Sequence, residues 1–350
     1  MVTETGKNCL AGIRDCALGA VALLGLSLAA SPATAQTQLR MANWLPPTHP
    51  LVQDVMLPYA EKVREATDGR VTIQLVGAPL GPPPAHYDFA VNGVADITYG
   101  VHGYTPGRFK TTVLAEVPFL GDSAEAISVG YWRTYEKMLA QAGEHDDVKV
   151  LAVFTHGPGH VFTKGRDLSS MEGVQGAKLR VGGGIAGDVA SALGAVPVLA
   201  PSSQSYEMLA GGVADGILFP YESVTFFKLD GILDTGLVVP GGLYNTSFFV
   251  VMNKARWDAL SDEDKKAIDG VSGEALARLA GQAWDAADAQ GRAAMEGKVE
   301  FLDASQEQID TISTALEPVV AAKLQEAAAA GIDAQAALDM LKAETAAASK

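Results

Sequence analysis

The pattern of apolar and polar positions in residues 39–76 predicts a strand, a helix and a second strand. The stretch 39–44 reads as a short strand, and apolar residues recur at helical spacing from Leu51 to Ala66. Residues 71–76 alternate between apolar and polar, which is typical of a strand with one buried face. A helix that joins two strands over so short a distance favours a parallel pair, and therefore an α/β fold.

One sequence motif occurs twice in the chain and predicts two lobes that share a plan. The stretch YDFAVNGVAD at residues 87–96 returns as YEMLAGGVAD at residues 206–215. Each copy reads as a short helix, a glycine that can take a positive φ where the helix ends, and the start of a strand. Two such copies suggest two lobes that face each other across a cleft, with chance similarity between ordinary helix–strand turns as the alternative.

The other predicted elements complete a two-lobed α/β fold, with mixed or parallel sheets flanked by helices. Strands are predicted at residues 148–154 and 177–181, and the β-prone run 247–252 can pass between the lobes. Ser261 is the N-cap of an extended helix whose apolar stripe continues to about Met295. A helix of roughly 30 residues would be about 45 Å long and could brace both lobes.

These elements divide the chain into a leader and two lobes. The last part of the chain, as far as Lys350, reads as an alanine-rich amphipathic helix. The predicted boundaries are residues 1–35 for a signal peptide, 36–156 with about 249–288 for the first lobe, and 157–248 with about 289–350 for the second lobe.

The first 35 residues have the pattern of an export signal. Lys7 and Arg14 precede an apolar run at residues 17–30, which is shorter than the ~20 residues that a membrane-spanning helix needs. Ala33 and Ala35 then form the A-x-A pattern of a signal-peptidase site. We therefore expect export and cleavage after Ala35, with a short buried helix as the alternative reading.

Charge and cysteine content exclude several classes of function. The chain carries 26 lysines and arginines against 41 acidic residues, so its formal net charge is −15. Such a protein repels nucleic acids and anionic membrane surfaces, and neither is an expected partner. Both cysteines, Cys9 and Cys16, lie in the leader, so the exported chain would have no disulfide, no catalytic thiolate and no cysteine-ligated metal.

A glycine-rich stretch at residues 182–187, GGGIAG, matches the G-x-G-x-x-G pattern of dinucleotide-binding loops. The helix that follows is short, and no acidic residue ends a strand about 20 positions later to bind a ribose. No cofactor is therefore expected. Backbone amides before a helix can still bind an anion, and Arg180 lies beside them. A guanidinium there can grip a carboxylate through two parallel hydrogen bonds, with an ordinary ion pair as the alternative.

Recognisable metal-binding and catalytic motifs are absent from the sequence. His156 and His160 are separated by Gly-Pro-Gly, which forbids a helix, so their imidazoles cannot share one helical face. No nucleophile elbow, H-E-x-x-H or phosphate-binding lysine motif occurs. We therefore expect a protein that is not an enzyme and holds no metal. The alternatives are an exported hydrolase or lyase, and a binding protein that serves a sensor or another transporter class.

Three stretches in a fixed order resemble one protein family. They are GAKLRV at residues 176–181, ALGAVP at 192–197 and SYEMLAGGVADG at 205–216, followed by Pro220. With them the chain resembles the periplasmic solute-binding subunits of tripartite ATP-independent periplasmic (TRAP) transporters, the DctP-like family. The resemblance implies a periplasmic, cleft-closing protein of the periplasmic-binding-protein fold, which captures a small organic anion and delivers it to the small and large integral membrane subunits. It also implies that Arg180 forms the salt bridge to the ligand's carboxylate.

Departures from the family pattern predict the character of the ligand. Many relatives carry a second ligand-facing arginine where this chain has Gly159, and an asparagine where it has Phe219. The loop asparagine after the arginine strand is replaced within residues 182–184. Fewer polar side chains and a new aromatic ring imply a carboxylate that is aromatic or otherwise apolar. The candidate ligand-binding residues are Arg180, Gly182, Gly183, His160, Phe219, Trp44, Asn43, His102, Tyr87, Tyr221 and Tyr244, with Tyr104 and Phe248 as further candidates for apolar walls.

Overall fold

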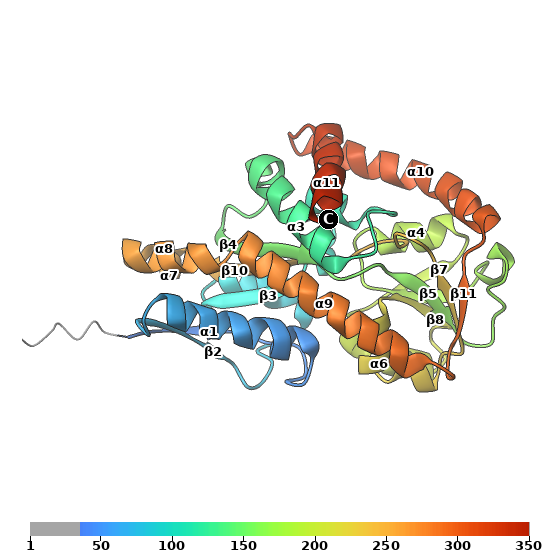
Figure 1. Ribbon diagram of the computed structural model, residues 1–350, viewed down its shortest axis with the longest axis horizontal. Helices are drawn as coiled ribbons and strands as arrows, with labels where there is room; N and C mark the ends of the chain where they lie inside the picture. The colour runs from blue at the N-terminus through green and yellow to red at the C-terminus, as the bar shows by residue number, and fades with distance from the viewer. Residues whose placement is uncertain (1–35, 350) are drawn as a thin grey trace, which may run out of the picture. The chain divides into compact units, whose positions relative to one another are not determined.

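The computed structural model describes residues 36–349, which form two mixed β-sheets with helices packed on them (Figure 1). The predicted signal peptide of residues 1–35, with its cleavage site after Ala35, lies outside the described residues. Among the residues that are described, no helix is both long and apolar enough to cross a membrane.

The first sheet is the centre of the first lobe. Its strands are β1 (Thr37–Met41), β2 (Val71–Leu75), β3 (Ile97–Val101), β4 (Val148–Thr155) and β10 (Ser247–Asn253), in the order β2-β1-β3-β10-β4. β1 and β2 are parallel, from Thr37 opposite Val71 to Met41 opposite Leu75, as the strand–helix–strand pattern predicted. β10 returns from far along the chain and pairs antiparallel with both β3 and β4.

The second sheet is the centre of the second lobe. Its strands are β5 (His160–Thr163), β6 (Lys178–Val181), β7 (Val196–Leu199), β8 (Gly216–Phe219), β9 (Thr235–Val238) and β11 (Glu300–Asp303), in the order β11-β9-β5-β8-β6-β7. β6 is parallel to β7 and β8, whereas β5 is antiparallel to β8 and β9. Two mixed sheets confirm the predicted two-lobed α/β class.

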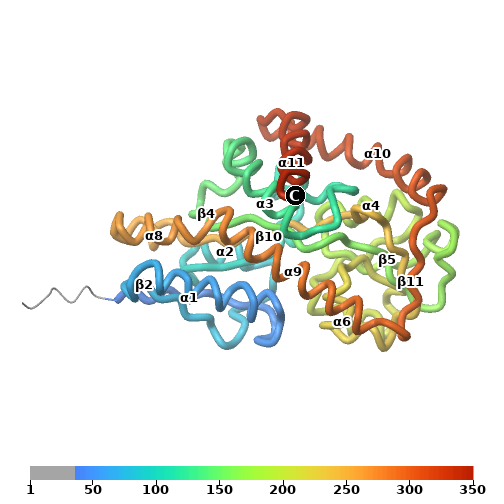
Figure 2. Tube along the Cα trace, in the orientation of Figure 1, coloured from blue at the N-terminus to red at the C-terminus, as the bar shows by residue number. Residues whose placement is uncertain are grey.

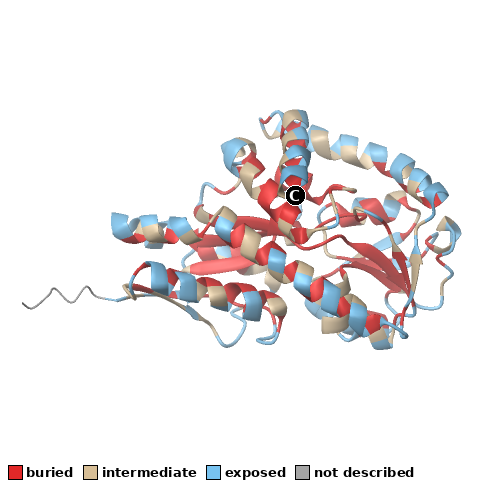
Figure 3. Ribbon diagram, in the orientation of Figure 1, coloured by how far each residue is buried: buried red, intermediate tan, exposed pale blue. Residues whose placement is uncertain are grey.

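Helices cover the sheets, so that the strands are mostly buried while the helices expose their outer faces (Figure 3). They are the π-helix η1 (Leu51–Met56), α1 (Leu57–Ala66), α2 (His86–Val91), α3 (Ala124–Thr134), α4 (Ala186–Ala192), α5 (Ser205–Ala210), α6 (Tyr221–Phe226), α7 (Lys254–Asp258), α8 (Asp262–Val271), α9 (Glu274–Met295), α10 (Gln306–Ala329) and α11 (Ala334–Ala348). α1 packs on β2, α3 packs on β4, and α4 packs on β6 and β7.

The repeated motif builds the same local structure in each lobe. Its first copy is α2 followed by β3, and its second copy is α5 followed by β8. Gly93 and Gly212 follow the two helices with φ of 68° and 69°, so the predicted positive φ is confirmed at both positions. Because β3 and β8 belong to different sheets, the prediction that the copies lie in separate lobes is confirmed as well.

Two short segments, residues 156–159 and 239–246, carry the chain between the sheets, and the chain passes a third time through α7, α8 and α9. The two short segments are joined where Gly159 N donates a hydrogen bond to Tyr244 O at 2.8 Å. A side chain on Gly159 would overlap the Tyr244 ring, so this close approach requires glycine. The run 247–252, which was expected to pass between the lobes, lies wholly within β10 of the first sheet, and the crossing precedes it.

The predicted long helix is two helices, because the chain breaks after α8. Gly273 has a φ of 60°, and its amide donates to Leu151 O at 2.6 Å instead of continuing the helix. A side chain at this glycine would lie 2.8 Å from the Trp132 ring. α9 runs along α3 of the first lobe and α6 of the second lobe (Figure 2). It therefore braces both lobes as predicted, although it is shorter than predicted.

The end of the chain differs from the expected helical extension. β11 pairs in parallel with β9 at the edge of the second sheet. α10 then begins with a capping box between Ser305 and Gln308. α11 packs against α3 of the first lobe, where Gly130 leaves room for Thr345. The predicted lobe boundaries had instead placed all of residues 289–350, and therefore α11, in the second lobe.

Candidate functional site

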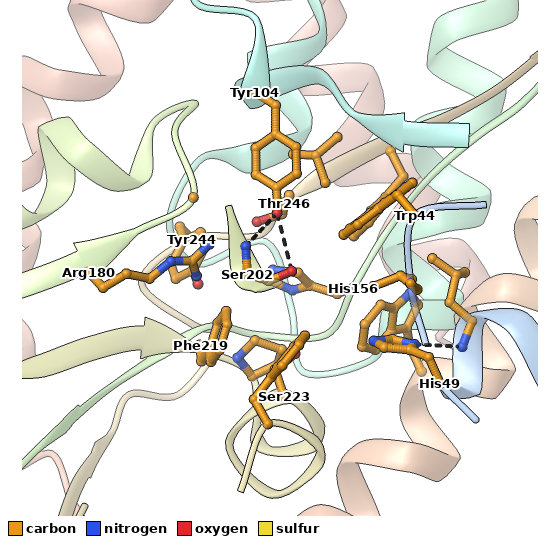
Figure 4. Close-up of a pocket in the computed structure, with 18 residues that line it drawn as sticks. Trp44, His49, Tyr104, His156, Arg180, Ser202, Phe219, Ser223, Tyr244 and Thr246 are labelled. Carbon is orange, nitrogen blue, oxygen red and sulfur yellow. Dashed lines mark hydrogen bonds between the residues drawn. The ribbon is translucent and has the colours of Figure 1, made fainter. Parts of the chain in front are cut away.

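A cavity lies between the two lobes, beside the crossing segments (Figure 4). The space between its lining atoms is about 480 Å³, part of which is open to solvent. The first lobe contributes Trp44, Leu45, His49, Leu51, Val101 and Tyr104, the crossing segments and β10 contribute His156, Tyr244, Thr246 and Phe248, the second lobe contributes Arg180, Gly182, Ser202, Phe219, Pro220, Ser223 and Phe227, and α9 contributes Trp284. A solute in this cavity therefore touches both lobes.

Arg180 is the cationic group of this cavity. It lies on β6, where its side chain points to the face opposite the core residues Leu179 and Val181. Only 2% of Arg180 is exposed, and its Nε and Nη2 donate to the carbonyl oxygen of Ala200 at 3.0 and 2.6 Å. This carbonyl occupies one edge of the guanidinium, and the Nη1–Nη2 edge can donate two further parallel hydrogen bonds.

Arg180 forms no ion pair with any carboxylate of residues 36–349. Burial lowers the pKa of its guanidinium, and the nearby phenols of Tyr104 and Tyr244 partly oppose that shift. The Cζ atom of Arg180 lies 4.6 Å from the centre of the Phe219 ring, in a cation–π contact. A buried cation without a counter-ion is unfavourable, so this end of the cavity favours an anion.

Tyr104 reaches from the first lobe to the second lobe at the Arg180 end of the cavity. Its hydroxyl oxygen accepts a hydrogen bond from Ser202 N at 3.0 Å and lies 3.4 Å from Ser202 Oγ. A Cβ on Gly182 would lie 3.5 Å from Arg180 Nη2 and 3.8 Å from the Tyr104 ring. Glycine at this position therefore leaves space beside the guanidinium.

Gly183 and Gly184 have a different role from the one expected for them. They contact Gly103 and Glu116 of the first lobe and do not line the cavity beside Arg180. A side chain on Gly183 would overlap the Gly103 carbonyl, and one on Gly184 would overlap the Glu116 carboxylate. Their positive φ angles, 92° and 60°, also favour glycine. The glycine-rich loop thus lets the two lobes touch.

Glu116 is an inter-lobe residue that the sequence analysis missed. It ends the 3₁₀ helix η4 (Thr112–Glu116), and its buried Oε1 accepts hydrogen bonds from Ser247 N at 3.0 Å and Ser247 Oγ at 2.6 Å. Its Oε2 accepts a hydrogen bond from Ile185 N of the second lobe at 3.0 Å. Burial raises the pKa of Glu116 above its usual value. Its signal in the sequence was a single acidic residue within the apolar run VLAEVPFL.

The two histidines of the first crossing differ in position. His156 lines the cavity, its Nδ1 is hydrogen-bonded to the Gly157 carbonyl, and burial lowers its pKa to about 4. The ring of His160, which was the expected ligand contact, lies 4.8 Å from the Tyr221 ring, outside the cavity lining. Its Nδ1 accepts a hydrogen bond from Val239 N at 3.3 Å. The structure therefore places His156, and not His160, at the cavity.

Asn43 and Tyr221 also lie outside the cavity lining. The Asn43 side chain accepts from Leu45 N at 3.0 Å and donates to Leu45 O at 2.9 Å, so it shapes the turn that carries Trp44. The hydroxyl of Tyr221 accepts a hydrogen bond from Arg292 Nη1 at 3.1 Å. Asn43 therefore supports the cavity wall through Trp44, whereas Tyr221 packs on His160 and Phe162 of the second lobe.

His102 and Tyr87 belong to the interior of the first lobe and not to the cavity lining. His102 Nε2 lies 3.1 Å from His145 Nε2, and His102 Nδ1 lies 3.1 Å from Ser247 Oγ. The Tyr87 ring packs edge-on at 5.4 Å from the Phe249 ring. Both residues were expected to contact the ligand, but the packing of the first sheet holds them inside the lobe.

The expected residues that the structure brings together around the cavity are Arg180, Gly182, Phe219, Trp44 and Tyr244, with Tyr104 and Phe248. Within residues 36–349, no three His, Cys, Asp or Glu side chains are grouped so as to hold a metal ion. The arrangement combines one cation with hydroxyl groups and flat apolar walls. Such a site suits an anion that has an apolar body.

His49 lies on the opposite side of the cavity from Arg180 (Figure 4). Its Nδ1 accepts a hydrogen bond from Leu51 N at 3.0 Å, and its ring packs 4.4 Å from the Phe226 ring. Its Nε2 lies 3.6 Å from Glu222 Oε1. Burial lowers the pKa of His49 to about 3 and raises the pKa of Glu222 to about 8, so both groups are uncharged near neutral pH. The sequence analysis assigned neither residue to the site.

Comparison with known proteins agrees with this geometry. The family model for bacterial extracellular solute-binding protein, family 7 (DctP), matches residues 41–327. A TRAP periplasmic solute-binding protein from Bordetella bronchiseptica, with bound (R)-mandelate and (S)-mandelate, is 42% identical, with a TM-score of 0.87 over 89% of this chain and 99% of that chain.

Two further relatives cover most of the chain. A marine metagenome TRAP solute-binding protein, specific for aromatic acid ligands and in complex with metahydroxyphenylacetate, is 32% identical, with a TM-score of 0.84 over 90% of this chain and 100% of that chain. The outer membrane transporter protein TsaT of Comamonas testosteroni is 33% identical over 91% of this chain and 96% of its own length.

The family match and the solved structures agree on one kind of protein. Proteins of this kind are periplasmic, bind small organic anions, work with the membrane subunits of TRAP transporters and are not enzymes. The resemblance seen in the stretches around Arg180 is therefore confirmed, and the exported hydrolase or lyase is not favoured. The chain belongs to the DctP family of bacterial extracellular solute-binding proteins.

Proposed function

We propose that this chain captures an aromatic monocarboxylate between its lobes, with Arg180 as the carboxylate clamp, and delivers it unaltered to TRAP membrane subunits. The observation that carries the proposal is the buried guanidinium of Arg180, which has no counter-ion among residues 36–349. Its Nη1–Nη2 edge matches the two oxygens of a carboxylate, whereas an ammonium group lacks this planar fork.

Flat apolar side chains support an aromatic ligand. The walls of the cavity include Trp44, Phe219, Phe227, Phe248 and Trp284. These rings can enclose the two faces of a ligand ring, and each Å² of apolar surface removed from water contributes about 25 cal/mol. A sugar acid would leave several hydroxyl groups against these rings without hydrogen-bond partners, which is unfavourable.

The ligands of the solved relatives support the same class. The Bordetella protein holds mandelate, and the marine protein holds metahydroxyphenylacetate. Both ligands are monocarboxylates with a benzene ring. Mandelate is therefore the first probe for this chain, because it comes from the relative with 42% identity.

Closure of the lobes would complete the binding site. The contacts from Tyr104 to Ser202 and from Glu116 to Ile185 join the two lobes directly. A ligand that touches both lobes binds the closed state more tightly and shifts the population towards it. Closure also removes water from the Arg180 end, which strengthens the ion pair in a protein whose net charge of −15 repels anions at long range.

Calorimetry with (R)-mandelate and Arg180→Lys tests the clamp. Loss of the bidentate geometry should weaken binding about 30-fold, because a hydrogen bond between charged groups is worth about 2 kcal/mol. Arg166→Lys is the matched control, since Arg166 lies in the same lobe and bonds the carbonyls of Gly173 and Gln175. Unchanged affinity in a folded Arg180→Lys protein contradicts the clamp. Failure of the native chain to bind any aromatic monocarboxylate contradicts the ligand class.

We further propose that export removes residues 1–35. Lys7, Arg14 and the A-x-A pattern at Ala33 and Ala35 support cleavage after Ala35. Cleavage there leaves Gln36 in front of β1, so every described strand is kept. Mass spectrometry of the protein from the periplasmic fraction should identify Gln36 as the first residue, and a mass that includes the leader contradicts the proposal.

A further inference from the structure

The side of the cavity away from Arg180 carries a hydrogen-bond donor that has no acceptor among residues 36–349. His49 lines the cavity, is 3% exposed, and accepts a hydrogen bond at Nδ1 from Leu51 N (Figure 4). Because the buried ring is uncharged, its one proton lies on Nε2. The carboxyl oxygen that faces Nε2, Glu222 Oε1, is 3.6 Å away, beyond normal hydrogen-bond distance.

An acceptor is linked to this donor through Glu222. Ser223 also lines the cavity, and its hydroxyl donates to Glu222 Oε2 at 2.7 Å. In this arrangement the protonated Glu222 carries its own proton on Oε1 and the Ser223 proton is used in the bond to Oε2, so the Ser223 oxygen can only accept a hydrogen bond from a group in the cavity. A hydroxyl group on a ligand could accept from His49 Nε2 and donate to Ser223 Oγ at the same time.

The walls between the two polar ends are apolar. Phe219 and Phe227 stack at 5.9 Å with an interplanar angle of 24°, and Trp44 and Trp284 line the cavity as well. A ligand held by its carboxylate at Arg180 would place its ring against these side chains. The part of the ring remote from the carboxylate would then approach His49 and Ser223.

We propose that His49 and Ser223 form a second polar subsite, which selects aromatic acids that carry a hydroxyl group on the ring, remote from the carboxylate. The proposal rests on the proposed function, because it requires Arg180 to hold the carboxylate end. His49 and Ser223 determine specificity by direct contact with the ligand. Glu222 is a positioning residue, because it holds the Ser223 hydroxyl through Oε2.

Binding of mandelate and of its 3-hydroxy and 4-hydroxy ring derivatives tests the subsite by calorimetry. The native protein should bind at least one hydroxy derivative about ten-fold more tightly than mandelate, because two neutral hydrogen bonds form in a buried site. His49→Phe and Ser223→Ala should each reduce this preference, which is the ratio of the two affinities, to about two-fold or less. His49→Gln keeps a donor near the Nε2 position and should restore part of the preference.

The ratio of the two affinities separates this subsite from a structural role. A variant that only loosens the fold weakens mandelate and its hydroxy derivatives alike, so an unchanged ratio in folded His49→Phe and Ser223→Ala overturns the proposal. Equal binding of mandelate and both derivatives by the native protein overturns it too. Neither result affects the clamp, whose failure would appear as unchanged mandelate affinity in Arg180→Lys.

Discussion

Glu116 of the first lobe accepts a hydrogen bond from the backbone of Ile185 in the second lobe, with 3.0 Å between Oε2 and N. The other carboxylate oxygen is bonded twice to Ser247, so Glu116 is anchored within its own lobe. The bond to Ile185 requires the two lobes to be together. Glu116 therefore stabilises the closed state without touching the cavity, since it is absent from the lining.

Glu116→Gln should weaken mandelate binding about five-fold, mainly through faster release. A glutamine side chain has one oxygen acceptor in place of two, so it cannot serve both Ser247 and Ile185, and one buried hydrogen bond is worth about 1 kcal/mol. Glu144→Gln is the matched control, because Glu144 accepts hydrogen bonds only within the first lobe, from Lys110 and Thr111. Stopped-flow measurement of release rates checks this, and equal release from both variants would contradict it.

Gly184→Ala should impair closure of the lobes. A Cβ at this position would overlap the Glu116 carboxylate, so the lobes would have to stay apart. We expect mandelate affinity to fall about ten-fold, and small-angle scattering to show no compaction when ligand is added. Gly176→Ala is the control, because its φ of 67° is equally unfavourable for alanine but no atom lies within 4 Å of its Cβ. Loss of affinity in both variants would assign the effect to backbone strain.

Phe219→Leu should lower mandelate affinity about three-fold. The substitution removes the aromatic face that lies 4.6 Å from the Arg180 guanidinium, and a cation–π contact contributes about 1 kcal/mol. Phe301→Leu removes a similar contact with Arg292, at 4.4 Å, outside the cavity lining. Calorimetry should therefore show weaker binding only for Phe219→Leu, whereas thermal unfolding should show a loss of stability for both variants.

Stability should fall as the pH rises from about 6.5 to about 8. Burial raises the pKa of Glu222 to about 8 and the pKa of Asp288 to about 7. Both carboxyls are thus protonated in the folded protein at a pH where the unfolded chain has ionised them. Their contribution to stability is present at low pH and is lost as the pH rises through the folded pKa. The midpoint temperature of thermal unfolding should fall over this pH range in the native protein. It should fall less in Glu222→Gln.

Below about pH 6.5 the stability should change in the opposite direction. All six histidines, which are His49, His86, His102, His145, His156 and His160, are buried, and burial lowers the pKa of each. The unfolded chain binds protons on these rings near pH 6.5, whereas in the folded protein their pKa values are lower, about 4 for His86 and about 3 for His49. The contribution of the histidines to stability is therefore present above pH 6.5 and is lost as the pH falls. An unfolding midpoint that stays constant from pH 6.5 to pH 4 would contradict this.

The repeated motif shows how much local sequence determines. Glycines followed by Val-Ala-Asp end α2 and α5, and both have positive φ because a helix end of this type needs it. The aspartates then make equivalent contacts, since Asp96 accepts from Arg40 N at 2.8 Å and Asp215 accepts from Lys178 N at 2.9 Å. These interactions depend on a few neighbouring residues and one adjacent strand, which is why the pattern predicted them well.

The errors in the predicted fold arise where distant elements meet. The sequence did not predict the break at Gly273, because the apolar stripe of α9 continues the stripe of α8. The break is caused by contacts of Gly273 with Leu151 and Trp132, which are distant in the chain. The return of α11 to the first lobe likewise depends on a fit between Gly130 and Thr345. Periodicity reports which face of a helix is buried, but not which element covers it.

By itself, the sequence determined the α/β class, the two repeated units and the strand that carries Arg180, because backbone hydrogen bonding and side-chain alternation are local properties. Only the tertiary structure decided which side chains share the cavity. It put Tyr87 and His160 outside the cavity lining, and placed His49 and Ser223 in the same lining although 174 positions separate them in the chain. Such contacts follow from how two complete lobes pack against each other, and that packing is a property of the whole chain and of no single segment.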